Sequence, residues 1–168
     1  MNDTKDRNLD IRLGSLKEAD TIAEFNTAMA LETEGIHLRP ERISAGVRHL
    51  IAHPELGFYL VAEQNAVIVG ALLVTTEWSD WRNGLFWWIQ SVYVHPEYRQ
   101  RRVYTRMYVK VKSMATESPG VCGFRLYVEQ ENRRAQQTYQ KLGMGETHYR
   151  IYEELKSGQS YFLDKSAS

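Results

Sequence analysis

The chain has 168 residues, 43% of them hydrophobic, so it can bury one core, and we expect residues 1–168 to form a single domain. Lysine plus arginine and aspartate plus glutamate both number 21, so no overall field favours nucleic acid or an anionic membrane as a partner. Any basic site must therefore be local.

Cys122 and the N-terminal residues indicate the cellular compartment of the protein. Cys122 is the only cysteine, so it cannot form an intramolecular disulfide, and its place in an apolar run predicts a small buried hydrophobe. Residues 1–10 are polar and of mixed charge, and no membrane-length apolar run follows them. We therefore expect a cytoplasmic protein without a signal peptide.

The first fifty-four residues predict a strand and two helices. Leu9–Leu13 alternates as a short strand, and Ser15–Glu18 reads as a capping box that opens a helix. Gly35 supplies the end of that helix. Pro40 can open a second helix, because its missing N–H is harmless there, and His53-Pro54 stops it.

A meander of strands follows. Phe58–Glu63 and Val67–Thr76 are rich in β-formers and are separated by a turn at Gln64-Asn65, which predicts a hairpin. Residues Trp78–Gly84 are rich in turn-forming residues and contain two aromatics. Leu85–Val94 is apolar at successive positions, which is typical of a strand covered on both faces. This strand should lie in the middle of the sheet.

The last third predicts helices alternating with strands. Apolar residues recur at helical spacing from Arg101 to about Glu117, and Val121–Val128 is a further strand. Asn132–Leu142 is another helix, and Glu146–Leu155 with Ser160–Leu163 predicts a closing hairpin. The order mixes antiparallel hairpins with crossovers, so we expect an α+β fold with a mixed, mostly antiparallel central sheet flanked by helices, and not a Rossmann fold.

A basic turn joins the central strand to the next helix. Residues 95–102 read His-Pro-Glu-Tyr-Arg-Gln-Arg-Arg, and a helix start offers unpaired N–H groups and a positive dipole end that favour an anion. A phosphate-bearing ligand could bind there. The alternative is a solvated basic helix face without a ligand, formed by Arg99, Arg101, Arg102 and Arg106.

A second segment, Asn132–Met144, occurs in the right order with the first. Together they resemble the GNAT (Gcn5-related) N-acetyltransferases, in which Val-x-Pro-x-x-Arg opens a helix and Asn-x-x-Ala-x-x-x-Tyr-x-x-x-Gly-Met/Phe follows. The resemblance spans nearly the whole chain. It implies the GNAT-like acyl-CoA N-acyltransferase fold and acetyl-CoA as co-substrate.

The turn departs from the family pattern at its small residues. The family normally has Arg/Gln-x-x-Gly-x-Gly/Ala, where this chain has Arg99-Gln100-Arg101-Arg102-Val103-Tyr104. A glycine lets the backbone approach the pyrophosphate, so Arg102 and Tyr104 either weaken coenzyme binding or replace backbone contacts by side-chain contacts. Tyrosine at the last position resembles one bacterial branch, which Leu31–Gly35 and Trp78–Gly84 also resemble.

The resemblance implies roles for residues on both segments. Backbone groups of Val92, Tyr93 and Val94 would pair with the pantetheine arm and face the thioester oxyanion. Tyr139 matches the tyrosine that can protonate the departing thiolate, although a half-buried helix tyrosine is the plain alternative. Asn132 matches a coenzyme contact and is also a good helix N-cap.

The acceptor amine must lose a proton before it attacks, so a carboxylate or a water chain is expected nearby. Aromatic side chains could wall the acceptor pocket. Each carboxylate is more ordinarily a solvated side chain. The candidates are Glu32, Glu34, Glu77 and Asp80 for the base, and Trp78 and Trp81 for the wall.

Other chemistries lack support in the sequence. His49 and His53 stand one helical turn apart, but no third ligand is apparent, so we expect no metal. The chain has no Walker A loop, G-x-G-x-x-G fingerprint, G-x-S-x-G elbow or paired CxxC.

The leading hypothesis is acetyl transfer from acetyl-CoA to a primary amine of a small molecule or peptide, by direct attack in a ternary complex. A catalytically silent acyl-CoA-binding regulatory module is the alternative, and nucleic-acid contact through the arginine turn is a weaker one that predicts steep salt dependence. We expect neither a nucleic acid nor a membrane as partner. A homodimer through Tyr152, Tyr161 and Phe162 is left open, and the sequence does not identify the acceptor.

Overall fold

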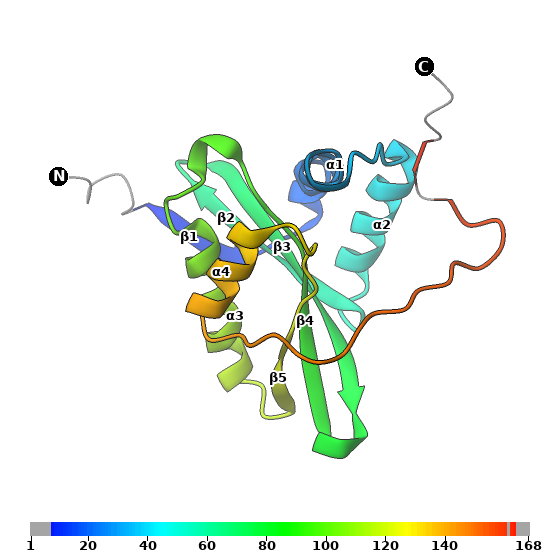
Figure 1. Ribbon diagram of the computed structural model, residues 1–168. Coiled ribbons are helices and arrows are strands. Elements are labelled where there is room, and N and C mark those ends of the chain that lie inside the picture. Colours follow the sequence, from blue (N-terminus) through cyan, green and yellow to red (C-terminus); the bar gives the residue numbers. More distant parts are fainter. Residues whose placement is uncertain (1–7, 161, 164–168) are drawn as a thin grey trace.

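A five-stranded sheet organises the computed structural model, which describes residues 8–160 and 162–163 (Figure 1). The strands lie in sequence order, and all neighbours are antiparallel except β4 and β5, which are parallel. The elements are β1 (Leu9–Leu13), α1 (Ala19–Glu34), α2 (Pro40–Ala52), β2 (Gly57–Gln64), β3 (Val67–Ser79), β4 (Gly84–Val94), α3 (Val103–Thr116), β5 (Val121–Arg125) and α4 (Arg133–Lys141). The expected α+β class with a mixed, mostly antiparallel sheet is confirmed.

Helices cover the sheet on both faces. Figure 1 shows α1 and α2 to one side of the strands and α3 and α4 to the other. Successive strand residues point to opposite faces, so Leu60 packs with Met107 of α3, whereas its neighbour Val61 packs with Ile22 of α1 and Val47 of α2. These five side chains are at most 1% exposed. The central strands therefore carry one core on each face, as the apolar run in β4 predicts.

Strand β4 contains a bulge near its end. Ala71 pairs with Tyr93 and Leu73 pairs with Gln90, so two residues of β4, Ser91 and Val92, oppose the single residue between Ala71 and Leu73. Ser91 takes a φ of 48°, in the left-handed region. The bulge bends β4 before its last residues, and nothing in the sequence around Ser91 predicts it.

The pairing of β4 with β5 ends early. It runs from Leu85 opposite Val121 to Trp88 opposite Arg125, and no described strand continues it along Ile89–Val94. We call this unpaired side of Ile89–Val94, away from β3, the open side of β4. Strand β5 is correspondingly shorter than the expected Val121–Val128. The two strands separate beyond Arg125, which leaves backbone groups of β4 without a strand partner on that side.

Three further local expectations are wrong. Helix α3 begins at Val103 rather than Arg101, because Arg102 takes a left-handed φ of 56° that no helix residue has. Cys122 is exposed rather than buried, because β5 is an edge strand with one neighbour.

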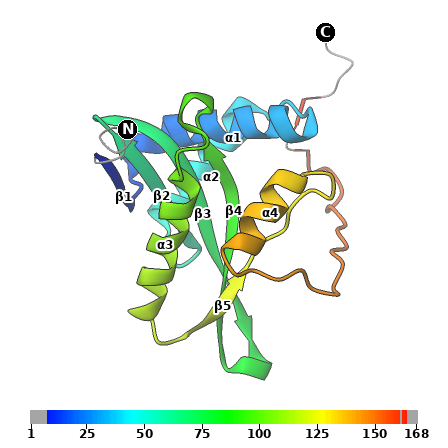
Figure 2. The ribbon, with the colours of Figure 1, turned by 60° about the vertical axis from the view of Figure 1, so that its left-hand side comes forward.

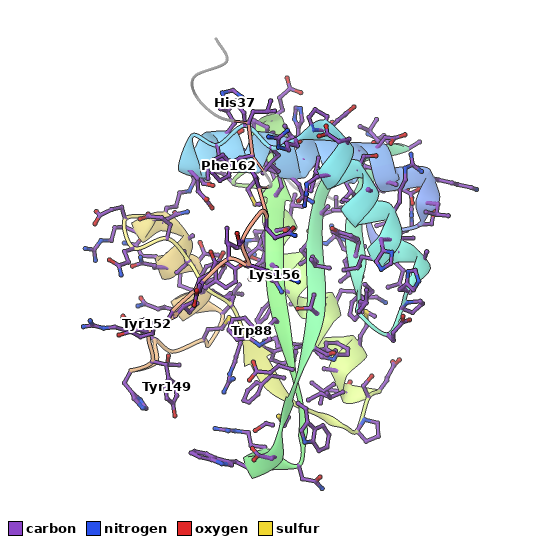
Figure 3. The ribbon with its side chains drawn as sticks, turned by 90° about the vertical axis from the view of Figure 1, so that its right-hand side faces the viewer. His37, Trp88, Tyr149, Tyr152, Lys156 and Phe162 are labelled. Atoms are coloured by element: carbon purple, nitrogen blue, oxygen red, sulfur yellow. The ribbon has the colours of Figure 1, made fainter. Side chains whose placement is uncertain are left out.

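The third wrong expectation is the closing hairpin. Residues 146–155 form no strand; Phe162 bridges instead to Leu38, and the Leu163 N–H donates to the His37 carbonyl at 2.7 Å. The segment thus finds its partner in the loop between α1 and α2. Figure 3 shows it passing the sheet toward His37, with Tyr149 and Tyr152 on its outer side. Tyr152 is 90% exposed, and Tyr161 lies outside the described residues.

None of the helices in the described part of the chain is long and apolar enough to cross a membrane.

Candidate functional site

Residues 95–102, the arginine turn, connect β4 to α3. A short 3-10 turn at Pro96–Tyr98 is followed by Gln100 and Arg102, which both take left-handed φ angles of 66° and 56°. The first N–H groups of α3 have no partner within the helix, and the helix dipole places positive charge at this end. A helix start with unpaired N–H groups therefore follows the turn, two residues later than the sequence predicts, and anion binding there stays a prediction.

The arginines of this turn do not form one solvated face. Arg99 turns inward: its Nε donates to the Val94 carbonyl at 2.9 Å, and its Nη2 donates to Oε2 of Glu32 at 2.6 Å. Arg101 lies over the ring of Tyr98 at 5.2 Å. Arg106 donates to the Leu9 carbonyl. Arg102 is exposed and, among the described residues, forms no ion pair.

The end of β4 is held firmly from the α1 side. Tyr93 is buried, with its ring 4.9 Å from that of Phe25. Its hydroxyl donates to Oε1 of Glu32 at 3.2 Å, so Glu32 bridges Tyr93 and Arg99. Burial, followed by the nearby charge of Glu32, raises the pKa of Tyr93. Glu32 therefore ties the end of α1 to the strand and to the arginine turn, and both of its oxygens are engaged.

Two tyrosines meet between α3 and α4. The rings of Tyr104, in the first turn of α3, and Tyr139, on α4, lie 5.6 Å apart at 74°. Val92 and Val94 pack against the same core cluster as Tyr104. Burial raises the pKa of Tyr139. Burial raises that of Tyr104 too, and a negative charge on Tyr139 raises it further. Both phenols thus stay protonated at neutral pH.

A cavity of about 300 Å³ lies on the α1 and α2 side of β4. Its apolar wall consists of Met29, Ala30, Ile36, Leu38 and Ile43. Its polar wall consists of Asn26, Glu34, Ser91, Tyr127 and Glu153. We call this hollow the α-side cavity.

The α-side cavity carries negative charge. Neither Glu34 nor Glu153 is in an ion pair among the described residues. The Tyr127 hydroxyl donates to Oε1 of Gln90 at 3.4 Å. The pKa of Tyr127 is raised by burial and then by the charges of Glu34 and Glu153. The cavity can therefore accept a group with an apolar stem and a cationic end.

Comparison with known proteins identifies the family. The model of the "Acetyltransferase (GNAT) family" matches residues 20–144. The chain belongs to this family. It is a GNAT acetyltransferase, and hence an acyltransferase, as the sequence resemblance predicts. No curated protein matches the chain.

Solved structures agree with this assignment. A "possible acetyltransferase" from Clostridium difficile 630 is 39% identical, with 89% of this chain and 99% of that chain covered and a TM-score of 0.82. A "predicted acetyltransferase" from Clostridium acetobutylicum, solved with acetyl-CoA, is 17% identical, with 87% and 96% covered and a TM-score of 0.71. An aminoglycoside N-acetyltransferase in complex with CoA is 18% identical, with 88% and 95% covered and a TM-score of 0.68. The last two show the shared GNAT fold alone.

Asn132 of this GNAT acetyltransferase is a helix cap. Its side-chain oxygen accepts from the Ala135 N–H at 3.1 Å, which satisfies one of the unpaired donors at the start of α4. The capping interpretation of Asn132 is thus confirmed, and a coenzyme contact by the same residue stays a prediction.

Most of the predicted acceptor residues lie outside the α-side cavity. Glu77 accepts from Arg125 at 2.7 Å and from the indole N–H of Trp88. Asp80 accepts from the Trp81 N–H in the turn between β3 and β4, at the opposite end of β4 from Val92–Val94. Trp78 is 60% exposed and Trp81 is 84% exposed, and neither lines the α-side cavity. Of the predicted carboxylates, only Glu34 lines the cavity.

Of the five residues in the polar wall of the α-side cavity, sequence reasoning named Glu34 and missed Asn26, Ser91, Tyr127 and Glu153. Tyr127 falls in a stretch expected to be strand, and Glu153 in the hairpin that does not form.

His49 and His53 stack at 4.0 Å, and His53 Nδ1 lies 2.7 Å from the His49 carbonyl. Within the described residues, no group of three or more His, Cys, Asp or Glu side chains could hold a metal.

Proposed function

We propose that this GNAT acetyltransferase transfers an acetyl group from acetyl-CoA to a primary amine of a small molecule or peptide, by direct attack in a ternary complex. The observation that carries the proposal is the position of β4. Its open side borders the arginine turn, and Ser91 of its bulge lines the α-side cavity. One strand therefore adjoins both a donor site and an acceptor site.

The donor side suits the coenzyme in two respects. Backbone groups at Val92, Tyr93 and Val94 on the open side of β4 can pair with the peptide-like pantetheine arm as an added strand. The start of α3, with Gln100, the exposed Arg101 and Arg102, and the N–H groups of Val103 and Tyr104, can hold the pyrophosphate. Arg99 contributes by fixing the strand end, because its guanidinium is engaged by Val94 and Glu32. The relative solved with acetyl-CoA supports this choice of donor.

The chain's own residues supply the chemistry of transfer. Backbone N–H groups on the open side of β4 would stabilise the oxyanion that develops at the thioester carbonyl. Tyr139, protonated at neutral pH because burial raises its pKa, would give its proton to the departing thiolate. Glu34 and Glu153 would attract the cationic acceptor, and a carboxylate of the pair or a water would take the proton that the amine loses.

The proposal is tested by calorimetry with acetyl-CoA and by thiol release across a panel of amines. We expect binding at micromolar to millimolar ligand and release with at least one amine. The Tyr139→Phe variant should lose roughly 10²-fold in kcat, the usual contribution of a general acid. No binding at millimolar acetyl-CoA would exclude the proposal, and binding without turnover would favour the silent acyl-CoA-binding module.

The acceptor site is tested separately. Glu34→Gln should lower kcat/KM for the amine and leave the KM for acetyl-CoA unchanged, because Glu34 lines the α-side cavity and not the donor side. Glu24→Gln, an exposed position of the same helix, is the control. Equal loss in both variants would mean that the effect is one of general charge.

A further inference from the structure

Tyr104 stands where the family pattern has glycine or alanine, and its side chain fills the space between α3 and α4. Its ring makes an edge contact with Tyr139 at 5.6 Å and stacks on Tyr108 at 6.2 Å and 19°. Tyr108 in turn meets Phe124 of β5 at 5.9 Å. A phenylalanine at position 104 would make the same ring contacts. The packing therefore explains the ring of Tyr104 and leaves its hydroxyl unexplained.

The hydroxyl of Tyr104 is buried without a partner. Its oxygen is inaccessible to solvent and has no hydrogen-bond partner among the described residues. Burying an unpaired hydroxyl costs stability, so the position would be more stable as phenylalanine. The hydroxyl also responds to Tyr139, since a negative charge there raises the pKa of Tyr104. The chain thus keeps a costly, protonated donor beside the tyrosine assigned to the leaving group.

We infer that Tyr104 is a positioning residue for acetyl transfer: its hydroxyl donates a hydrogen bond to the phenolic oxygen of Tyr139 as Tyr139 gives up its proton. The inference rests on the proposed function. Burial disfavours the phenolate of Tyr139, and a hydrogen bond donated to that oxygen by the neighbouring hydroxyl would lower the cost of forming it.

The proton and electron balance is simple. The amine nitrogen forms a bond to the thioester carbon, and the carbon–sulfur bond breaks with its electron pair on sulfur. The sulfur takes the proton of Tyr139, and Tyr104 keeps its own proton while it donates to the resulting phenolate. The proton lost by the amine nitrogen returns Tyr139 to the phenol, through water. Thioester and amine become thiol and amide, with no other reactant.

The test compares single and double tyrosine variants with acetyl-CoA and the best amine of the panel. Tyr104→Phe should lower kcat about tenfold, the value of one hydrogen bond to a charged group, with both KM values unchanged. Its Tm should not fall, because an unpaired buried hydroxyl is removed. In the Tyr139→Phe background, the Tyr104→Phe change should have no further effect, since the oxygen it serves is gone. Tyr108→Phe, the ring stacked on Tyr104, is the control and should keep the wild-type kcat.

Each other outcome overturns the inference in a distinguishable way. An unchanged kcat in Tyr104→Phe, while the wild type turns over, rejects the role of Tyr104 alone. An equal loss in the wild-type and Tyr139→Phe backgrounds means that Tyr104 does not act through Tyr139. A raised KM for acetyl-CoA with kcat unchanged makes Tyr104 a coenzyme contact instead. A wild type that binds acetyl-CoA and releases no thiol with any amine removes both this role and the proposed function.

Discussion

Gln100 and Arg102 hold backbone conformations that glycine adopts without steric cost. Their φ angles of 66° and 56° lie in the left-handed region, where a side chain costs on the order of 1 kcal/mol per residue. The arginine turn thus keeps the left-handed backbone of a glycine turn at both residues. The exposed guanidinium of Arg102 pairs with no described carboxylate. The strained backbone of Arg102 therefore places an unpaired cation at the start of α3.

Replacing Arg102 by glycine should separate the effect of backbone strain on stability from the effect of the side-chain charge on coenzyme affinity. Arg102→Gly relieves the left-handed strain, so Tm should rise by a few degrees, about what 1 kcal/mol produces in a chain of this size. Affinity for acetyl-CoA should nevertheless fall about tenfold, because a cation facing phosphate is lost. Differential scanning fluorimetry and calorimetry at two salt concentrations measure both effects.

Gln100→Gly is the matched control, because it relieves the same conformation without removing a charge. It should gain stability to the same extent, and its affinity for acetyl-CoA should fall less than that of Arg102→Gly, because no cation is removed. If Arg102→Gly binds acetyl-CoA more tightly, the arginine is a defect in the turn rather than a phosphate ligand.

The start of the first helix is an ionic cluster as well as a cap. Ser15 and Glu18 form the predicted capping box, and Glu18 is also paired with Arg12 of β1 at 3.0 Å. Burial acts to raise the pKa of Glu18, but the hydrogen bonds from Arg12 and Ser15 outweigh it and hold the pKa at about 2, against an ordinary 4.5. The carboxylate thus joins the first strand to the first helix.

Acid should weaken this junction over a defined window. Because the folded pKa of Glu18 is depressed, its stabilisation is complete above pH 4.5 and is lost as pH falls toward 2. Glu18→Gln should cost on the order of 2 kcal/mol at pH 7 and flatten the fall in unfolding free energy between pH 5 and 3. Urea unfolding at each pH measures it. The exposed Glu24→Gln should follow the wild-type curve, and a Glu18→Gln curve parallel to the wild type would contradict the assignment.

The elements that sequence could predict are those with a local signal. The capping box of Ser15, Pro40 at the first helical position and the apolar run of β4 each carry such a signal, and each is confirmed. The bulge at Ser91 has none, because serine in a left-handed conformation is specified by the pairing of β3 and β4 rather than by its neighbours in the chain. The early end of β5 is a tertiary effect of the same kind.

At the scale of the whole molecule, β4 adjoins the proposed donor side and the α-side cavity. The sequence allows the residues of the first to be predicted better than those of the second. The residues of the proposed donor side could be named from the sequence, because the arginine turn and α4 are contiguous motifs. Most of those of the α-side cavity could not, because its lining comes from α1, α2, the bulge and the C-terminal segment. Glu153 lies in residues 146–155, which form no strand, and Phe162 of the same C-terminal segment pairs with Leu38. Figure 2, turned from Figure 1, shows this segment leaving α4 and rising toward α1.

Helix α4 is lightly anchored to the sheet. None of its residues is buried, and it is held by the Asn132 cap, the ring contact of Tyr139 with Tyr104, and the packing of Leu142 and Met144 against the core. Such an element opens locally at low cost. A coenzyme that contacts α4, the start of α3 and the open side of β4 at once would tie it to the sheet.

Coenzyme A should therefore protect α4 more than the rest of the molecule. At 100 times its Kd, a ligand stabilises the folded protein by about 2.7 kcal/mol, and an element that opens on its own gains protection only if the ligand holds it closed. Hydrogen exchange of residues 133–141 should slow about tenfold or more on binding. The donor site does not touch α2, so the exchange rates of those α2 amides that exchange fast should change little. Protection confined to α3 would place the coenzyme on the arginine turn alone, and Tyr139 would then have no thiolate within its reach.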